Sequence, residues 1–263
     1  MGIRRRIELV ATAHADDLSL RALAEITAIT ADQNVRIIGG QMASLLLTAF
    51  AVPGITLRRT RDADAAITTE VAGSGVIHER LLDSGYVATS GNSYTRPVPD
   101  LAVAGAPVPE LAVDLLVPSF DGRFRAEEHG GRPFDAAPGL APALAAEPIV
   151  IDTGARLLNG SVLEFAVRVP TVELALVIKA LAYGSRRQAR DIEDIYRLLE
   201  IADTYPLDEI GGWRLHETPL QASSRDAAGH LHELAGRSRR LADVDVPPAR
   251  LATLIASLVG RPG

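Results

Sequence analysis

The hydrophobic pattern of the chain switches repeatedly between the spacing of helices and the spacing of strands. Over residues 18–31, apolar side chains recur every three or four positions, which predicts a helix with one buried stripe. Further helices are predicted over residues 41–50 and 70–84, and the pattern stays helical from Thr171 to the end. Extended apolar runs predict strands over residues 35–40, 58–67, 111–118, 148–152 and 162–169, with a hairpin over residues 86–98.

This alternation predicts an α/β (α+β) fold, with a mixed sheet and flanking helices in an N-terminal lobe and a mainly helical C-terminal lobe. Residues 119–147 are rich in Gly, Pro and Ala, a composition typical of a loop or linker. The predicted division is residues 1–120 for the first lobe, 121–160 for a linker with strands, and 161–263 for the helical lobe. Two lobes of one domain would give the same pattern.

Composition narrows the classes of protein that fit. The net charge of -6 excludes a wholly basic nucleic-acid coat, so any site for a polyanion must be a local patch. The absence of cysteine excludes disulfides and thiolate metal sites and fits a reducing, cytoplasmic location. The N-terminus resembles a signal peptide only weakly, because its apolar part is short and contains Glu8. The longest apolar run, residues 42–53, is too short to span a bilayer, so no membrane partner is expected.

Two aspartates stand one residue apart in the motif R-x-T-x-D-x-D at residues 58–64. Side chains at i and i+2 of a strand point to the same face. The motif therefore predicts one polar stripe, formed by Arg58, Thr60, Asp62 and Asp64. Carboxylates beside a cation and a hydroxyl suit Mg²⁺ and a triphosphate, and a solvated sheet edge is the alternative interpretation.

Two further positions are candidates for the same chemistry. Gly39 and Gly40 lie between a predicted strand and a predicted helix. Because they lack β-carbons, their backbone N–H groups and the helix N-terminus could approach a phosphate; an ordinary turn is the other interpretation. Asp114 lies inside an apolar predicted strand, where a carboxylate needs a partner. It is either a third metal-facing carboxylate or the acceptor of a structural hydrogen bond.

The only lysine among the 27 basic residues is Lys179. Its predicted helix is apolar on nearly all sides, so the ammonium must reach solvent or meet an anion. We expect this helix to break at Gly184-Ser185. The next helix then carries two candidate phosphate-binding cations, Arg187 and Arg190. Each has an aspartate four residues later, and simple surface pairs of these i,i+4 neighbours are the alternative.

Taken in order, these residues form a recognisable set. It consists of Gly39-Gly40, a helix, the motif at residues 58–64, and a lysine-bearing helix followed by R-x-x-x-R-D-x-x-D at residues 186–194. The set resembles the AbiEii/MenT-type nucleotidyltransferases, the toxins of AbiE and MenAT toxin–antitoxin systems, within the DNA-polymerase-β-like nucleotidyltransferase superfamily. The resemblance covers roughly residues 34–202. One departure is Gln41, where many members have serine; a hydroxyl contact to phosphate is then absent or comes from Ser44.

The resemblance implies a role for each candidate residue. Asp62 and Asp64 would be catalytic ligands of Mg²⁺ or Mn²⁺, with Asp114 as a third ligand. Lys179 and Asp191 would complete the catalytic set, with Asp191 orienting Lys179 or the nucleotide; Asp194 is the alternative for that part. The residues left to bind the nucleotide and its phosphates would be Gly39, Gly40, Arg58, Thr60, Arg187 and Arg190.

The resemblance also implies transfer of a nucleotide from a nucleoside triphosphate to the 3′ end of tRNA, which blocks translation, and a cognate antitoxin from a neighbouring gene. Two alternatives remain open: transfer to a small-molecule or protein hydroxyl, and a catalytically inactive nucleotide-binding interaction protein. Arginines at 186–190 and 237–240 are either RNA phosphate contacts or solvated helix faces. His230 and His232 point to different sides of a predicted helix, which argues against a zinc site.

Overall fold

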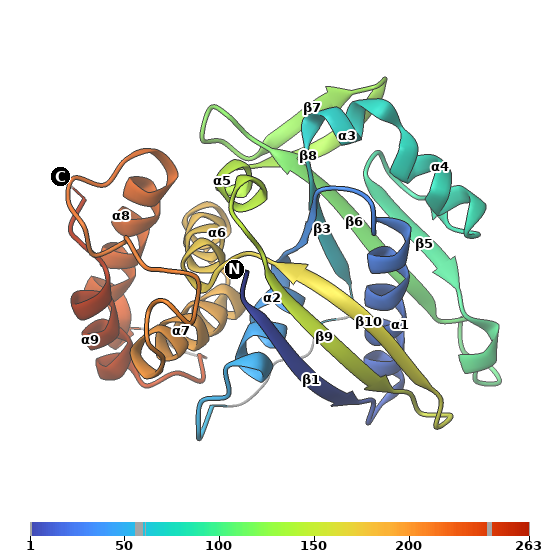
Figure 1. The fold of residues 1–263 in the computed structure, drawn as a ribbon, viewed down its shortest axis with the longest axis horizontal. Helices are drawn as coiled ribbons and strands as arrows, with labels where there is room; N and C mark the ends of the chain where they lie inside the picture. Colours follow the sequence, from blue (N-terminus) through green and yellow to red (C-terminus); the bar gives the residue numbers. More distant parts are fainter. Residues whose placement is uncertain (1, 56–59, 61, 241–243, 263) are drawn as a thin grey trace.

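A computed structural model describes residues 2–55, 60, 62–240 and 244–262. The fold is mixed α/β, as the sequence predicts, with two sheets on one side and a group of helices on the other (Figure 1). None of the helices that the structure describes is both long and apolar enough to cross a membrane.

The larger sheet holds the candidate carboxylates. Its strands run in the order β2-β3-β6-β5-β4, and β8 pairs with both β6 and β7. β3 and β6 are parallel, whereas β2 and β5 run antiparallel to their neighbours β3 and β6. The strand bounds are β2 Val35–Ile37, β3 Ala63–Ile67, β4 Val87–Ala88, β5 Ser93–Pro97, β6 Glu110–Pro118, β7 Arg125–His129 and β8 Arg132–Ala137.

The smaller sheet has the order β1-β9-β10 and lies beside the first helix. Its strands are β1 Arg4–Val10, β9 Ile149–Arg156 and β10 Val162–Val169. Helix α1 (His14–Ile29) contacts β10 of this sheet and β3 and β6 of the larger one, so the buried stripe predicted from its sequence lies between the two sheets. Helix α2 (Gly39–Ala49) packs against β3 on one side and the C-terminal helices on the other.

The C-terminal helices pack on each other and on α2. They are α6 Val172–Arg186, α7 Ala189–Thr204, α8 Ala222–Arg237 and α9 Pro248–Leu258. One continuous hydrophobic core includes Ile26 of α1, Val113 of β6, Leu176 of α6 and Leu254 of α9. This core is therefore shared by the helical segment and the larger sheet, and α2 and the short helix α5 (Leu140–Ala145) contact both of them.

The structure corrects the prediction of a loop or linker over residues 119–147. This stretch contains β7, β8 and the short helix α5 (Leu140–Ala145), and β8 joins the larger sheet beside β6. The hairpin was missed because β7 is largely exposed and so lacks the alternating apolar pattern of a strand. The hairpin turn is Gly130-Gly131, and both residues have positive φ. These glycines contribute to the glycine-rich composition that was interpreted as a linker.

Residues 4–10, which resemble a signal peptide only weakly, form β1 and pair in parallel with β9. Three predictions about other elements are corrected. The helix predicted over residues 70–84 is two helices, α3 (Thr69–Ser74) and α4 (Val76–Asp83), separated by Gly75 at φ 73°. Helix α6 continues through Gly184-Ser185 and ends at Arg186, just before Arg187, whose φ is 52°. The strand that carries the aspartates begins at Ala63, so Asp62 precedes it.

Candidate active site

Two carboxylates meet on one face of the larger sheet. Asp64 of β3 lies directly opposite Asp114 of the parallel strand β6, so both side chains point to the same face. Ser93 of β5 is the register partner of Asp114 on its other side. Both aspartates are half-buried. The parallel pairing of β3 and β6 therefore brings together two acidic residues that are fifty positions apart in the sequence.

The N-terminus of α2 is built against Asp64. Gly39, the first residue of the helix, has φ 69°, and a β-carbon on it would lie 1.8 Å from Asp64 Oδ2. The backbone N–H of Ile38, the residue before the helix, donates to the carbonyl oxygen of Asp64 at 2.9 Å. Only glycine combines this backbone conformation with such a close approach. The first turn of a helix has backbone N–H groups without intrahelical partners, and it favours negative charge nearby.

Burial and neighbouring carboxylates raise the pKa of both Asp64 and Asp114. Burial, followed by the charge of Asp114, raises the pKa of Asp64 to about 7, while Lys179 and Arg186 act in the opposite direction. Burial also raises the pKa of Asp114, and the charges of Asp62 and Asp135 add to that effect. The site is thus an acidic cluster on the sheet, faced by cations of α6.

Lys179 is buried, with 3% of its surface exposed, and it is paired inside the helical segment. Its Nζ lies 2.7 Å from Asp194 Oδ2 and 3.9 Å from Asp191 Oδ1. Arg186 binds Asp191 through two hydrogen bonds of 2.6 and 2.7 Å, and Arg197 donates to Asp194 at 3.1 Å. Asp191 and Asp194 are both buried. Together these five side chains form one ionic network between α6 and α7, which we call the α6–α7 network.

The α6–α7 network changes two interpretations of the sequence. Asp191 pairs with Arg186 and Asp194 pairs with Lys179 and Arg197, so these contacts replace the predicted i,i+4 pairs of α7. Arg187 instead reaches Glu233 of α8 at 2.6 Å, and Arg190 is exposed. Of the two candidates for orienting Lys179, Asp194 is the nearer.

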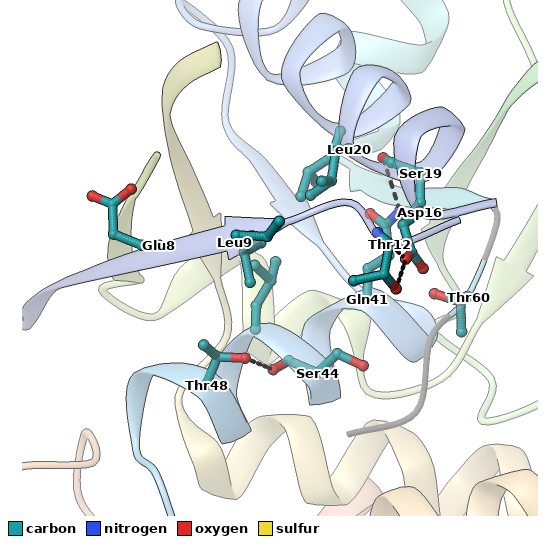
Figure 2. A pocket seen from close by; sticks show the side chains of 13 residues that line it. Glu8, Leu9, Thr12, Asp16, Ser19, Leu20, Gln41, Ser44, Thr48 and Thr60 are labelled. Atoms are coloured by element: carbon teal, nitrogen blue, oxygen red, sulfur yellow. Dashed lines mark hydrogen bonds between the residues drawn. The ribbon is translucent and has the colours of Figure 1, made fainter. Parts of the chain in front are cut away.

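The remaining predicted site residues lie around the start of α2. Asp62 is exposed at the entry to β3, and Gly40 is buried in the first turn of α2. Thr60 lines a cavity of about 330 Å³ between α1 and α2, together with Gln41 and Ser44 (Figure 2). Arg58 lies outside the described residues. The carboxylate pair itself is not part of the cavity lining, so this hollow adjoins the candidate site rather than forming it.

Asp135 is a site residue that sequence analysis missed. Asp135 lies on β8 and pairs in register with Leu116 of β6. Because Leu116 is two residues after Asp114, the two aspartates lie on the same face of the sheet. Its charge contributes to the raised pKa of Asp114, and it accepts a hydrogen bond from Asn92 at 3.3 Å. In the sequence, Asp135 is one aspartate in a segment interpreted as a linker. Only the pairing of β8 with β6 shows that its side chain lies near Asp114.

A divalent cation suits this cluster if it arrives with a phosphate ligand. Within the described part of the chain, no group of three or more His, Cys, Asp or Glu side chains is arranged to hold a metal ion. Mg²⁺ commonly takes one or two protein carboxylates and completes its shell with phosphate oxygens and water. The mutual repulsion of Asp64 and Asp114 is what such a cation would relieve. The predicted set of three metal ligands, Asp62, Asp64 and Asp114, stays a prediction.

Comparisons with known proteins do not assign this chain to a family. No protein-family model matches the sequence, and no curated protein matches it. The chain is similar to the crystal structure of an antigenic nucleotidyltransferase-like protein from Paracoccidioides brasiliensis, with 16% sequence identity and a TM-score of 0.48. The similarity covers 93% of this chain and 94% of that one. Any activity of this chain must therefore be argued from its own residues.

The contact between Gly39 and Asp64 predicts that Gly39→Ala displaces the carboxylate and lowers stability. The new β-carbon would overlap Asp64 Oδ2, and alanine is also strained at φ 69°. Gly54→Ala is the matched control, because Gly54 has φ 80° and, among the described residues, no atom lies within 4 Å of an added β-carbon. We expect the control to cost about 1 kcal/mol and Gly39→Ala to cost more, measured by urea unfolding. Equal losses for the two variants would contradict the close contact.

The α6–α7 network predicts that Lys179→Met is strongly destabilising. Removing the ammonium leaves buried aspartates with one cation fewer, which typically costs about 3–5 kcal/mol. Replacing Asp194 as well, in Lys179→Met/Asp194→Leu, should recover part of that loss because the buried charge is removed with its partner. Unfolding free energies would measure both effects. A single variant as stable as the wild type would show that the ammonium is not needed to neutralise these aspartates.

Proposed function

We propose that the protein is a metal-dependent nucleotidyltransferase of the AbiEii/MenT type, which transfers a nucleotide from a nucleoside triphosphate to the 3′ end of tRNA. The observation that carries the proposal is the contact of Asp64 with Gly39, beside Asp114 and opposite Arg186. A helix N-terminus next to paired carboxylates offers, within one small region, groups for the phosphates and for a cation.

In this proposal, the first turn of α2 binds the phosphates. The backbone N–H groups at Gly39 and Gly40 are at the helix N-terminus, where phosphate oxygens are favoured. Both residues lack a β-carbon, so a phosphate can approach the backbone closely. Thr60, which lines the neighbouring cavity, is the candidate hydroxyl from the R-x-T-x-D-x-D motif.

Asp64 and Asp114, with Asp62 at the entry to β3, would hold Mg²⁺ or Mn²⁺. When bound, the metal would neutralise negative charge on the phosphates and lower the pKa of an attacking hydroxyl. The acceptor oxygen bonds to the α-phosphorus as the bond to pyrophosphate breaks, and pyrophosphate leaves with the electron pair. A carboxylate of the cluster accepts the hydroxyl proton.

The α6–α7 network would set the electrostatic field opposite the carboxylates. Lys179 and Arg186 both favour the charged form of Asp64. Arg186 is half exposed although its carboxylate partner Asp191 is buried, so its guanidinium is the member of the network best placed to meet a phosphate. Lys179 is a positioning residue in this account, because its ammonium is already bound by Asp194.

The tRNA acceptor, the toxic effect on translation and the cognate antitoxin belong to the proposal through the ordered set of motifs. The set is retained in this chain from Gly39 to Asp194, apart from Gln41 in place of serine. The cytoplasm, where tRNA and nucleoside triphosphates meet, is the location that this activity requires.

The proposal predicts that Asp64→Asn and Asp114→Asn abolish transfer of a labelled nucleotide to tRNA. The purified protein would be incubated with total tRNA, Mg²⁺ and each labelled nucleoside triphosphate, and the RNA resolved on a denaturing gel. We expect a loss of at least about a hundredfold. Each variant lacks a carboxylate that would hold the metal, and the metal would stabilise the charge at the reacting phosphate. Asp83→Asn, an exposed aspartate at the end of α4, should retain activity.

Each contrary result points to a different function. Label that enters a protein or a small molecule, and not RNA, would favour transfer to a different hydroxyl. If wild type labels nothing but binds a nucleoside triphosphate, the protein acts as a nucleotide-binding partner. Full activity of Asp64→Asn would refute the site itself.

A further inference from the structure

A second cavity lies on the other side of α6, beyond the ionic network. It has a volume of about 760 Å³ and is lined by the last turn of α6, the face of α8 and the loop after β6. Gly184 and Ser185 line it, and they immediately precede Arg186. The cavity therefore begins next to the one cation of α6 that is both half exposed and electrostatically coupled to Asp64.

The loop after β6 carries two exposed aromatic side chains. Phe120 is 74% exposed and Phe124 is 43% exposed, and Phe124 lines the cavity. The loop is fixed at its base, because the backbone N–H of Ser119 donates to the carbonyl oxygen of Ala137 at 2.9 Å. Exposed aromatic rings on an anchored loop are poor candidates for core packing and suit stacking against a planar ligand.

Two arginines line the same cavity as Phe124. Arg123 lies between the two phenylalanines in the sequence, and Arg225 and His230 of α8 line the opposite wall of the cavity. Arg225 lies 3.4 Å from Asp226, so part of its charge is balanced locally. Gly184 keeps the wall close, because a β-carbon there would lie 2.3 Å from the ring of His230. In a protein whose net charge is -6, aromatic and cationic side chains are combined here in one hollow.

The loop is connected to the carboxylate site through one strand. Asp114 lies on β6, and β6 ends at Pro118, just before the loop. At about 3.3 Å per residue, β6 ends about 13 Å from Asp114, and the loop begins one residue later. A ligand that stacks on the loop could thus extend toward the carboxylates along the same strand.

We infer that the loop 119–124 and the cavity behind it bind the single-stranded end of an RNA acceptor, with bases stacked on Phe120 and Phe124 and phosphates near Arg123, Arg225 and His230. The inference depends on the proposed function only for the acceptor's identity. The combination of aromatic rings with a cationic groove is the general means by which proteins hold single strands. A duplex cannot use the rings, because its bases are stacked on each other.

The test is fluorescence anisotropy with a short labelled single-stranded RNA and with duplex RNA of the same sequence, without nucleotide or divalent cation. Phe124→Ala should weaken single-strand binding about tenfold, and Phe120→Ala/Phe124→Ala should weaken it further. Arg123→Gln should lower the slope of log affinity against log salt by about 0.7. The controls are Val87→Ala, 60% exposed on β4, and Arg6→Gln on β1, which should bind like wild type. Thermal melting would verify that every variant is folded.

The outcomes separate this inference from the proposed function. Unchanged affinity in the phenylalanine variants, equal affinity for the duplex, or no binding by wild type would each overturn the RNA surface; the last result would favour a protein partner. If wild type binds RNA with the expected dependence but transfers no nucleotide, the surface stands and the proposed function fails. If both hold, Phe124→Ala should raise KM for tRNA and leave kcat unchanged.

Discussion

The contact between the Asp64 carboxylate and the Cα of Gly39 is the constraint on which the rest of the site depends. It fixes the N-terminus of α2 against β3. It also requires a residue with no β-carbon and a positive φ at the first position of the helix. The parallel pairing of β3 with β6 then places Asp114 beside Asp64. Helix α6 packs on α2, and the charge of its residue Arg186 acts on Asp64. This close approach, the β3–β6 pairing and the packing of α6 on α2 together align a helix N-terminus, two acids and a cation.

The charges around this contact are costly to the folded protein when no ligand is present. Burial and neighbouring acids raise the pKa values of Asp64 and Asp114, so their charged forms are disfavoured in the fold. The α6–α7 network is different, because Lys179, Arg186 and Arg197 are matched with Asp191 and Asp194. The acids of the sheet are compensated only in part, because their pKa values stay raised although Lys179 and Arg186 act in the opposite direction on Asp64. The buried aspartates of the α6–α7 network are each paired directly with a cation. This difference is why we assign ligand binding to the sheet and positioning to the interior of the helices.

The sequence was informative where a residue's role is local or periodic. The helix at α1, the strand at β6 and the hairpin of β4 and β5 follow from apolar spacing and turn residues, and the placing of Asp114 in an apolar strand pointed to a polar site. It was uninformative where the partner is distant in the chain. Asp135 has meaning only through the pairing of β8 with β6, and the exposed hairpin of β7 has no apolar alternation to reveal it. Similarly, the i,i+4 rule suggested surface pairs for Asp191 and Asp194, whereas burial against α6 gives both carboxylates to Lys179 and Arg186.

The central claim is that a nucleoside triphosphate binds with its phosphates at the first turn of α2 and its metal at Asp64 and Asp114. The most direct measurement is a crystal structure with a non-hydrolysable nucleotide and Mn²⁺, using the anomalous signal of manganese to locate the metal. We predict manganese bound to Asp64 and Asp114, with phosphate oxygens within hydrogen-bonding distance of the backbone N–H groups at Gly39 and Gly40. A nucleotide bound elsewhere, or manganese absent from both aspartates, would contradict the account.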